Sequence, residues 1–224
     1  GLIKFDLLVI TNLMQIALAV KLIKERHNLE SFCALPGQDD WSDTFYLEDE
    51  KSLKLASDGK LKGIFQFDSL GIRELCKLGG VDKFDDLVAF ASLFRPGPIQ
   101  AKMHTSYCDR KQGRESYETH PLLKPILDST YGVLCFQEQI MRIFNVAGGF
   151  PLTECYKIVK AISKKKGDVF KKAKDGFISG CQLRLGYTEE KANEFFDQLA
   201  GFSEYAFNRC AIGSTIIYNA VSGQ

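Results

Sequence analysis

The sequence predicts a mostly α-helical protein with a few short strands, and three observations support this fold class. From residue 61 onward the chain divides into segments with helical start and stop signals. Glycine pairs at 79–80 and 148–149 follow two of these segments, where a helix commonly ends in a left-handed residue. Alternation of polar and apolar residues, which is typical of strands, marks residues 2–9.

The first elements follow from these short-range patterns. Residues 2–9 predict a strand with one polar face, which carries Lys4 and Asp6. A helix is expected within residues 11–26, because hydroxyl and amide side chains that can cap it precede an apolar stripe. Residues 31–60 read as a loop-rich surface connection with one short helix or strand.

Caps and glycines divide the rest of the chain into further helices. Asp68 or Ser69 is expected to cap one helix and Asp82 the next, while Arg95-Pro96-Gly97-Pro98 is expected to form a fixed turn. The apolar segment 132–136 reads as a short strand or an extended piece. The remaining helices are expected at residues 99–111, 122–127, 137–147, 153–163, 168–183 and 188–199.

Composition is that of an ordinary soluble globular protein. The 224 residues are 45% hydrophobic and 25% charged, enough for one large domain or two small ones. The seven cysteines are dispersed without a C-x-x-C pair, and the three histidines are isolated. We therefore do not expect a structural zinc site. Such cysteines are typical of a reducing cytoplasm, and no apolar run has the length of a membrane span. The chain starts without a methionine, so we expect an internal fragment of a longer protein.

The net charge of +1 conceals an uneven distribution. Residues 157–174 hold eight lysines against one acid, Asp168, whereas residues 39–50 carry six carboxylates and no base. A basic stretch of this kind predicts a partner with phosphate groups. A solvated helix face is the alternative interpretation, but the scarcity of acids in the stretch favours phosphate contact.

Lys4 and Asp6 lie two residues apart on the predicted strand and therefore share a face. A carboxylate beside a fixed cation suits metal-assisted phosphoryl transfer, in which the acid holds Mg²⁺ and the ammonium group meets phosphate oxygens. A surface salt pair would have the same spacing. Spacing alone favours the salt pair.

Seven sequence blocks occur in a distinctive order along the chain. The first is GLIKFDLL, and the others are GIFQFDSLGIREL (63–75), FRPGPIQ (94–100), DRKQGRE (109–115), HPLLKPILDSTYGVLCFQEQIM (120–141), AISKKK (161–166) and EYAFNR (204–209). In this order they resemble blocks of the C-family DNA polymerases, the bacterial DNA polymerase III alpha subunits. GLIKFDLL is similar to the family's palm strand G-L-x-K-F-D-F-L.

The resemblance implies a fold, an activity and site residues. Residues 1–11 would end a nucleotidyltransferase-like palm domain and residues 12–209 would form the helical fingers domain of a DNA-directed DNA polymerase. Asp6 would be one of three catalytic aspartates that bind two Mg²⁺ ions, and Lys4 would approach the incoming triphosphate. Phosphate or template contacts would come from the fingers, at Arg95, Lys160, Lys164, Lys165, Lys166, Asn208 and Arg209.

The same resemblance implies that this chain alone is inactive. The family's other two aspartates form an Asp-x-Asp pair upstream of Gly1, and one aspartate cannot hold two metal ions. The family's Arg-Arg pair is Val159-Lys160 here, which weakens any triphosphate clamp because lysine lacks the bidentate fork. The implied partners are primer–template DNA and deoxynucleoside triphosphates. The sliding clamp and other replicase subunits would bind through regions outside this chain.

Residues 210–224 depart from the family, which continues with Ser-His-Ala. CAIGSTII resembles the opening block of an intein, with Cys210 as its nucleophile, and a diverged or frameshifted terminus is the alternative. Two other functions remain open beside the polymerase: a non-catalytic nucleic-acid-binding helical module, and a helical interaction protein. The seven ordered blocks argue against the last.

Overall fold

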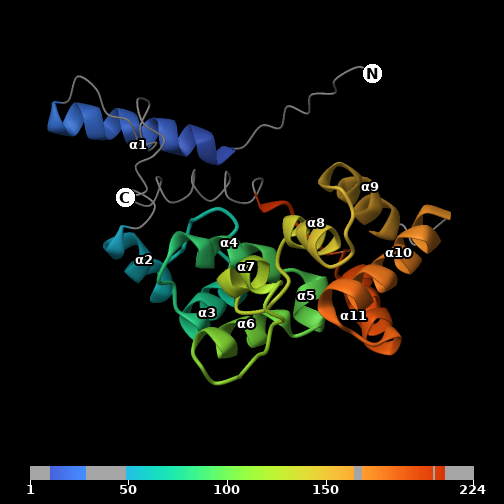
Figure 1. Ribbon diagram of the computed structural model, residues 1–224. Helices are drawn as coiled ribbons and strands as arrows, with labels where there is room; N and C mark the ends of the chain where they lie inside the picture. The colour runs from blue at the N-terminus through green and yellow to red at the C-terminus, as the bar shows by residue number, and fades with distance from the viewer. Residues whose placement is uncertain (1–10, 29–48, 164–167, 204, 210–224) are drawn as a thin grey trace, which may run out of the picture.

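The computed structural model describes residues 11–28, 49–163, 168–203 and 205–209, and this part of the chain is mostly helical (Figure 1). The predicted fold class is confirmed for these residues. Among these residues, a strand-like backbone pairing occurs as an isolated parallel β-bridge between Phe136 and Phe207. The strand expected at residues 2–9 lies outside the described residues.

The helices form two packing groups, with α1 (Thr11–His27) preceding both in the chain. The first group contains α2 (Glu50–Ser57), α3 (Leu70–Gly79), α4 (Phe84–Leu93), α5 (Pro96–Gln100) and α6 (Met103–Lys111). The second contains α7 (Lys124–Leu127), the 3-10 turn η2 (Asp128–Thr130), α8 (Gln137–Val146), α9 (Leu152–Ser163), α10 (Asp168–Leu185) and α11 (Glu189–Ser203). In Figure 1 the two groups follow one another from α2 and α3 at one end to α9, α10 and α11 at the other.

Several helix ends have the physical cause that the sequence predicted. The helix α3 ends at Gly79, and Gly80 then takes a positive φ of 67° that a glycine adopts without strain. The side chain of Thr188 accepts a hydrogen bond from the Lys191 N–H at 3.2 Å, which caps α11. The predicted cap Ser69 directly precedes α3, but its side chain makes no capping hydrogen bond.

Other boundaries correct the sequence prediction. Asp82 does not cap α4; the Oδ2 atom of Asp86, inside the helix, accepts the N–H groups of Asp82 and Lys83 at 3.0 and 3.3 Å. The helix expected at 99–111 is two helices, because the chain turns at Lys102 with a positive φ of 54°. The fixed turn at 95–98 is itself the start of α5, whose first helical residue is proline.

The helix expected from residue 122 starts at Lys124, and the helix expected to end near residue 199 continues to Ser203. These two shifts do not change the order of the elements. The extension of α11 follows from packing, because Leu199, Ala200 and Phe202 are buried in the second core and hold its last turns in place.

Each packing group has its own apolar core. Phe67, Ile72, Phe90 and Leu93 are almost fully buried in the first core, and the rings of Phe144, Phe177 and Phe196 pack at tilted and edge-on angles in the second. Met103 packs against both cores, and so joins them. The five described cysteines are free and buried in these cores, where a thiol packs as a small apolar group; they are Cys76, Cys108, Cys135, Cys155 and Cys181.

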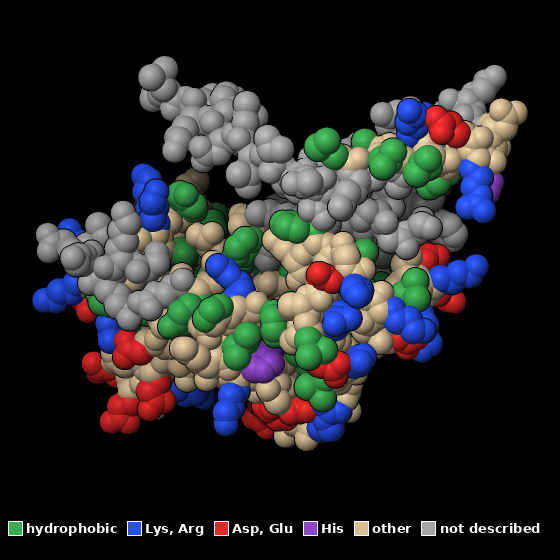
Figure 2. Space-filling view, turned by 180° about the vertical axis from the view of Figure 1, so that it is seen from behind, with side chains coloured by type: hydrophobic (Ala, Val, Ile, Leu, Met, Phe, Trp, Pro, Cys, Tyr) green, Lys and Arg blue, Asp and Glu red, His purple; other side chains and the backbone are tan. Residues whose placement is uncertain are grey.

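The molecular surface carries mixed charge. On the face in Figure 2, basic and acidic side chains are interspersed, and exposed hydrophobic side chains lie between them. Within the part of the chain that the structure describes, no helix is both long enough and apolar enough to cross a membrane.

Candidate functional site

Two segments far apart in the chain meet at the N-terminus of α8. Phe136 and Phe207 form the parallel bridge, and the N–H of Gln137 donates to the carbonyl of Phe207 at 2.9 Å. The buried side chain of Gln139 fixes the geometry, since its Oε1 accepts the N–H groups of Cys135 and Phe136 at 2.8 and 3.0 Å. The segment 205–209 is therefore held against the first turn of α8.

Arg95 lies at this junction, at the residue that directly precedes α5, where its side chain makes no capping hydrogen bond. Its guanidinium carbon is 4.6 Å from the centre of the Phe207 ring, a cation–π distance. A second contact joins the same two segments, since a Cβ atom on Gly97 would clash with the ring of Tyr205. Glycine at position 97 thus lets the aromatic ring approach the backbone of α5.

Arg209 is held in the same place by three contacts. Its Nη2 atom donates to both carboxylate oxygens of Asp85 at 2.7 and 2.8 Å. Its backbone N–H is 3.1 Å from both carboxylate oxygens of Glu138, and its guanidinium carbon is 5.6 Å from the centre of the Phe136 ring. Arg95 and Arg209 therefore stack on the two phenylalanines that the bridge joins.

The junction exposes two arginines, whose charges are balanced by Asp85 and Glu138. The side chain of Arg209 is 48% exposed, and Arg95 and Asn208 are also exposed at the surface. Arginine presents donors in a planar fork that matches the oxygens of a phosphate group. The arrangement brings together three residues that the sequence singled out as phosphate or template contacts.

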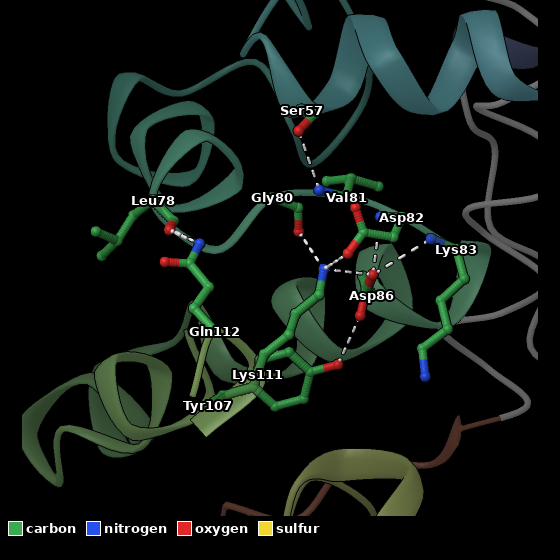
Figure 3. Close-up of polar contacts among 10 residues, drawn as sticks. All are labelled: Ser57, Leu78, Gly80, Val81, Asp82, Lys83, Asp86, Tyr107, Lys111 and Gln112. Atoms are coloured by element: carbon green, nitrogen blue, oxygen red, sulfur yellow. Dashed lines mark hydrogen bonds and ion pairs between the residues drawn. The ribbon is translucent and has the colours of Figure 1, made fainter. Parts of the chain in front are cut away.

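A buried polar network supports α4 directly behind this surface (Figure 3). The Asp86 carboxylate, which is fully buried, accepts from the Tyr107 hydroxyl at 2.9 Å and from the Lys111 ammonium at 2.7 Å. Lys111 also donates to the Gly80 carbonyl at 2.7 Å and pairs with Asp82 at 2.9 Å. The network ties α6 to the N-terminal turn of α4, where Asp85 lies.

The network has pKa shifts that follow from its geometry. Burial opposes the charged form of Lys111, but its hydrogen bonds to Asp86 and Asp82 outweigh burial and raise the pKa of Lys111. Burial, together with the negative charge of Asp86, raises the pKa of Tyr107 well above its ordinary value. Both groups therefore keep their protons, and the network stays intact, at neutral pH.

Lys160 lies on α9, with its ammonium 5.9 Å from the centre of the Tyr156 ring. Val159, which replaces the first arginine of the family's pair, is only 2% exposed in the second core. Lys4, Asp6, Lys164, Lys165, Lys166 and Cys210 lie outside the described residues.

Sequence reasoning missed the residues that hold the arginines. Asp85, Glu138 and Gln139 were not singled out, although the last two lie in the block FQEQ that carries the resemblance. Their roles depend on partners distant in sequence, which a local pattern does not show. Among the described residues no three histidine, cysteine or carboxylate side chains come close enough together to hold a metal ion.

Comparison with known proteins gives the family. The family model of the bacterial DNA polymerase III alpha subunit finger domain matches residues 12–184. The DNA polymerase III subunit alpha of Aquifex aeolicus is 40% identical over 211 residues, which are 93% of this chain and 17% of that protein. The subunits of the same name from Halalkalibacterium halodurans and Escherichia coli K12 are 37% and 34% identical, each over 93% of this chain and 18% of their own length.

This chain thus spans about a fifth of the length of the curated relatives that it matches. The matched region covers most of α1 through α10, and so includes Arg95 and Asp85 of the junction. The chain belongs to the family of bacterial DNA polymerase III alpha subunits, within their finger domain.

Proposed function

We propose that this chain is the fingers part of a DNA-directed DNA polymerase and binds the phosphate groups of its substrates. In the reaction, the 3′-hydroxyl oxygen of a primer attacks the α-phosphorus of a deoxynucleoside triphosphate, and the bond to the β-phosphate breaks. Residues 1–11 would end the palm and residues 12–209 would form the fingers. The finger-domain match over residues 12–184 supports this division.

The observation that carries the proposal is the meeting of two arginine-bearing motifs at one surface. Arg95 and Arg209 come from blocks more than a hundred residues apart, yet both stack on the Phe136–Phe207 pair. Asn208 lies between Phe207 and Arg209 in the chain, and Lys160 on α9 adds a further cation. Charge-assisted hydrogen bonds to phosphate are the interaction that such groups make most strongly.

The lysine cluster at 164–166 is proposed as a second phosphate contact. Its support is the sequence alone, since the surrounding stretch carries eight lysines and one acid. If the three lysines touch duplex DNA, changing Lys164, Lys165 and Lys166 together to alanine reduces the slope of log affinity against log salt by about 2–3. An unchanged slope would mean that the cluster is a solvated face.

Asp6 and Lys4 are proposed for the catalytic step on the basis of the resemblance of GLIKFDLL to the palm strand. Asp6 would contribute one carboxylate to a Mg²⁺ site, and the ion would supply electrostatic stabilisation of the transferring phosphate. Lys4 would meet the triphosphate. The chemistry of a carboxylate donor fits Mg²⁺, which prefers oxygen ligands.

Primer extension by a polymerase that contains this chain tests the proposed function. Asp6→Asn should abolish nucleotide addition while primer–template DNA still binds, because losing a metal ligand removes several kcal/mol of transition-state stabilisation. Activity within about tenfold of wild type would refute the role of Asp6. DNA binding by the wild-type protein without any extension would favour the non-catalytic nucleic-acid-binding module instead.

We also propose that Cys210 begins an intein, on the resemblance of CAIGSTII to an intein's first block. Its thiolate would attack the carbonyl carbon of Arg209 and turn that peptide bond into a thioester. Mass spectrometry of the longer gene product in cells should then show Arg209 joined to a downstream Ser-His-Ala. An unspliced product would exclude this assignment. We further propose that the longer protein is cytoplasmic. We also propose that a sliding clamp binds the longer protein outside this chain.

A further inference from the structure

The guanidinium group of Arg209 is held by an aromatic ring and a carboxylate. Its carbon lies 5.6 Å from the centre of the Phe136 ring, and Asp85 accepts both of its hydrogen bonds from the single nitrogen Nη2. Among the described residues, the structure records no acceptor for the Nε–H and Nη1–H groups. Nε–H and Nη1–H point to different sides of the group, so a phosphate oxygen would accept from one of them, and the Arg209 side chain is 48% exposed.

The backbone of Arg209 is fixed independently of its side chain. Glu138 accepts its N–H, and the adjacent bridge between Phe136 and Phe207 fixes the preceding residues. Without Asp85, the long side chain could still rotate about its own bonds, and each orientation lost on binding would weaken the interaction. Asp85 is the contact that removes this freedom.

We propose that Asp85 is a positioning residue, which orients the remaining donors of Arg209 toward a phosphate group. This inference deepens the proposed function and rests on its assignment of Arg209 as a phosphate contact. The ligand chemistry is a phosphate with two free oxygens, and its source is either a nucleoside triphosphate or the backbone of DNA. Neighbouring Arg95, stacked on Phe207, lies at the same junction and adds a second positive charge.

The sign of the effect distinguishes positioning from simple charge. Asp85 is an acid near an anion site, so its negative charge alone would repel phosphate, and Asp85→Asn would strengthen binding. Positioning predicts the opposite, because the loosened Arg209 must be ordered again at each binding event. If Asp85 had only a structural role, Asp85→Asn would change the free energy of unfolding and would neither weaken nor strengthen phosphate binding.

The experiment is a thermodynamic cycle on the 224-residue chain at low salt. Inorganic triphosphate and a single-stranded oligonucleotide are titrated separately into wild type, Asp85→Asn, Arg209→Ala and the double variant. Asp85→Asn should weaken binding about threefold to fivefold, the range of an exposed ion pair, and should have no effect once Arg209 is alanine. Asp85→Glu, which keeps the carboxylate, should restore part of the loss.

The matched control is Glu115→Gln, which removes a carboxylate of similar exposure, 39% against 42% for Asp85, from an arginine pair with Arg110 at 2.8 Å. It should leave both affinities unchanged or slightly stronger. A loss confined to triphosphate would identify the nucleotide as the source of the phosphate, and a loss confined to the oligonucleotide would identify DNA. Hydrogen exchange of the Gln137 amide, which should stay protected in Asp85→Asn, shows that the bridge to Phe207 is intact.

Equal or tighter binding by Asp85→Asn, or an equal loss in the Arg209→Ala background, would overturn the inference. So would a wild-type chain that binds neither probe, since Arg209 would then contact no phosphate. Neither result decides the polymerase assignment, which primer extension with Asp6→Asn tests separately. Conversely, an Asp85-dependent affinity would stand even if no extension were found.

Discussion

Replacing Lys111 with methionine should destabilise the protein by about 3–5 kcal/mol, the cost of breaking a buried ion pair on one side. The side chain of Lys111 is only 5% exposed, and its ammonium contacts three oxygens, those of Gly80, Asp82 and Asp86. Methionine keeps most of the volume. It leaves the fully buried Asp86 carboxylate with neutral donors alone, the Tyr107 hydroxyl and two backbone N–H groups (Figure 3).

Urea unfolding followed by circular dichroism measures the loss, with an unchanged slope showing that the surface exposed on unfolding is the same. Lys77→Met is the matched control, since Lys77 pairs with Glu74 at 2.8 Å but both side chains are about half exposed. That pair should contribute less than about 1 kcal/mol. Adding Asp86→Asn to Lys111→Met should recover much of the loss, because the amide oxygen still accepts the helix N–H groups without a buried charge.

The pH dependence of this loss has a definite sign. Because the folded-state pKa of Lys111 is raised, its contribution is complete below the ordinary lysine pKa of about 10.4 and is lost as pH rises through the folded value. The difference between wild type and Lys111→Met should therefore be constant from pH 7 to 9 and shrink above that. A difference below about 1 kcal/mol at pH 7 would refute the reasoning, since it would mean that Asp86 is solvated without its cation.

Two further predictions concern the junction and the cores. Gly97→Ala should displace the Tyr205 ring and so speed hydrogen exchange of the Gln137 amide, whereas Gly201→Ala, at an open position without a positive φ, should leave that exchange unchanged. Burial raises the pKa of Cys76 and Cys181 to about 12 and contributes most to a pKa of about 11 for Cys108, whereas unfolded thiols ionise near 8.5. The stabilisation from these protonated thiols should therefore be complete below about pH 8 and should have decreased by about pH 10.5. The midpoint of urea unfolding measures this, and a midpoint that did not change with pH would contradict the burial of these thiols.

The sequence predicted the helices best where the signal is local. Gly80 ends α3 and Thr188 caps α11 because a positive φ and a hydroxyl acceptor act within one turn. The prediction of a single helix at 99–111 was wrong because apolar spacing alone does not show that the chain turns at Lys102. That turn depends on how α5 and α6 pack, which is tertiary information.

The candidate site divides in the same way. The arginines could be named from motifs, but their juxtaposition depends on the bridge between Phe136 and Phe207, which are 71 residues apart. No local rule pairs such segments. Gln139, which fixes that bridge with four hydrogen bonds from a buried position, looks in sequence like any polar residue in the first turn of a helix.

Asp85 and Asp86 are adjacent carboxylates with opposite fates, and helical periodicity explains the difference. Asp86 precedes Phe90 by four residues and Leu93 by seven, and both of these are fully buried, so Asp86 lies on the buried stripe of α4. A carboxylate in that register requires a cation, and Lys111 supplies it. Asp85, one residue earlier, is turned about 100° away toward solvent and is free to meet Arg209. The first turn of α4 therefore connects the buried network to Arg209 at the surface. The network around Asp86 holds this turn in place, and with it Asp85, the carboxylate that orients Arg209.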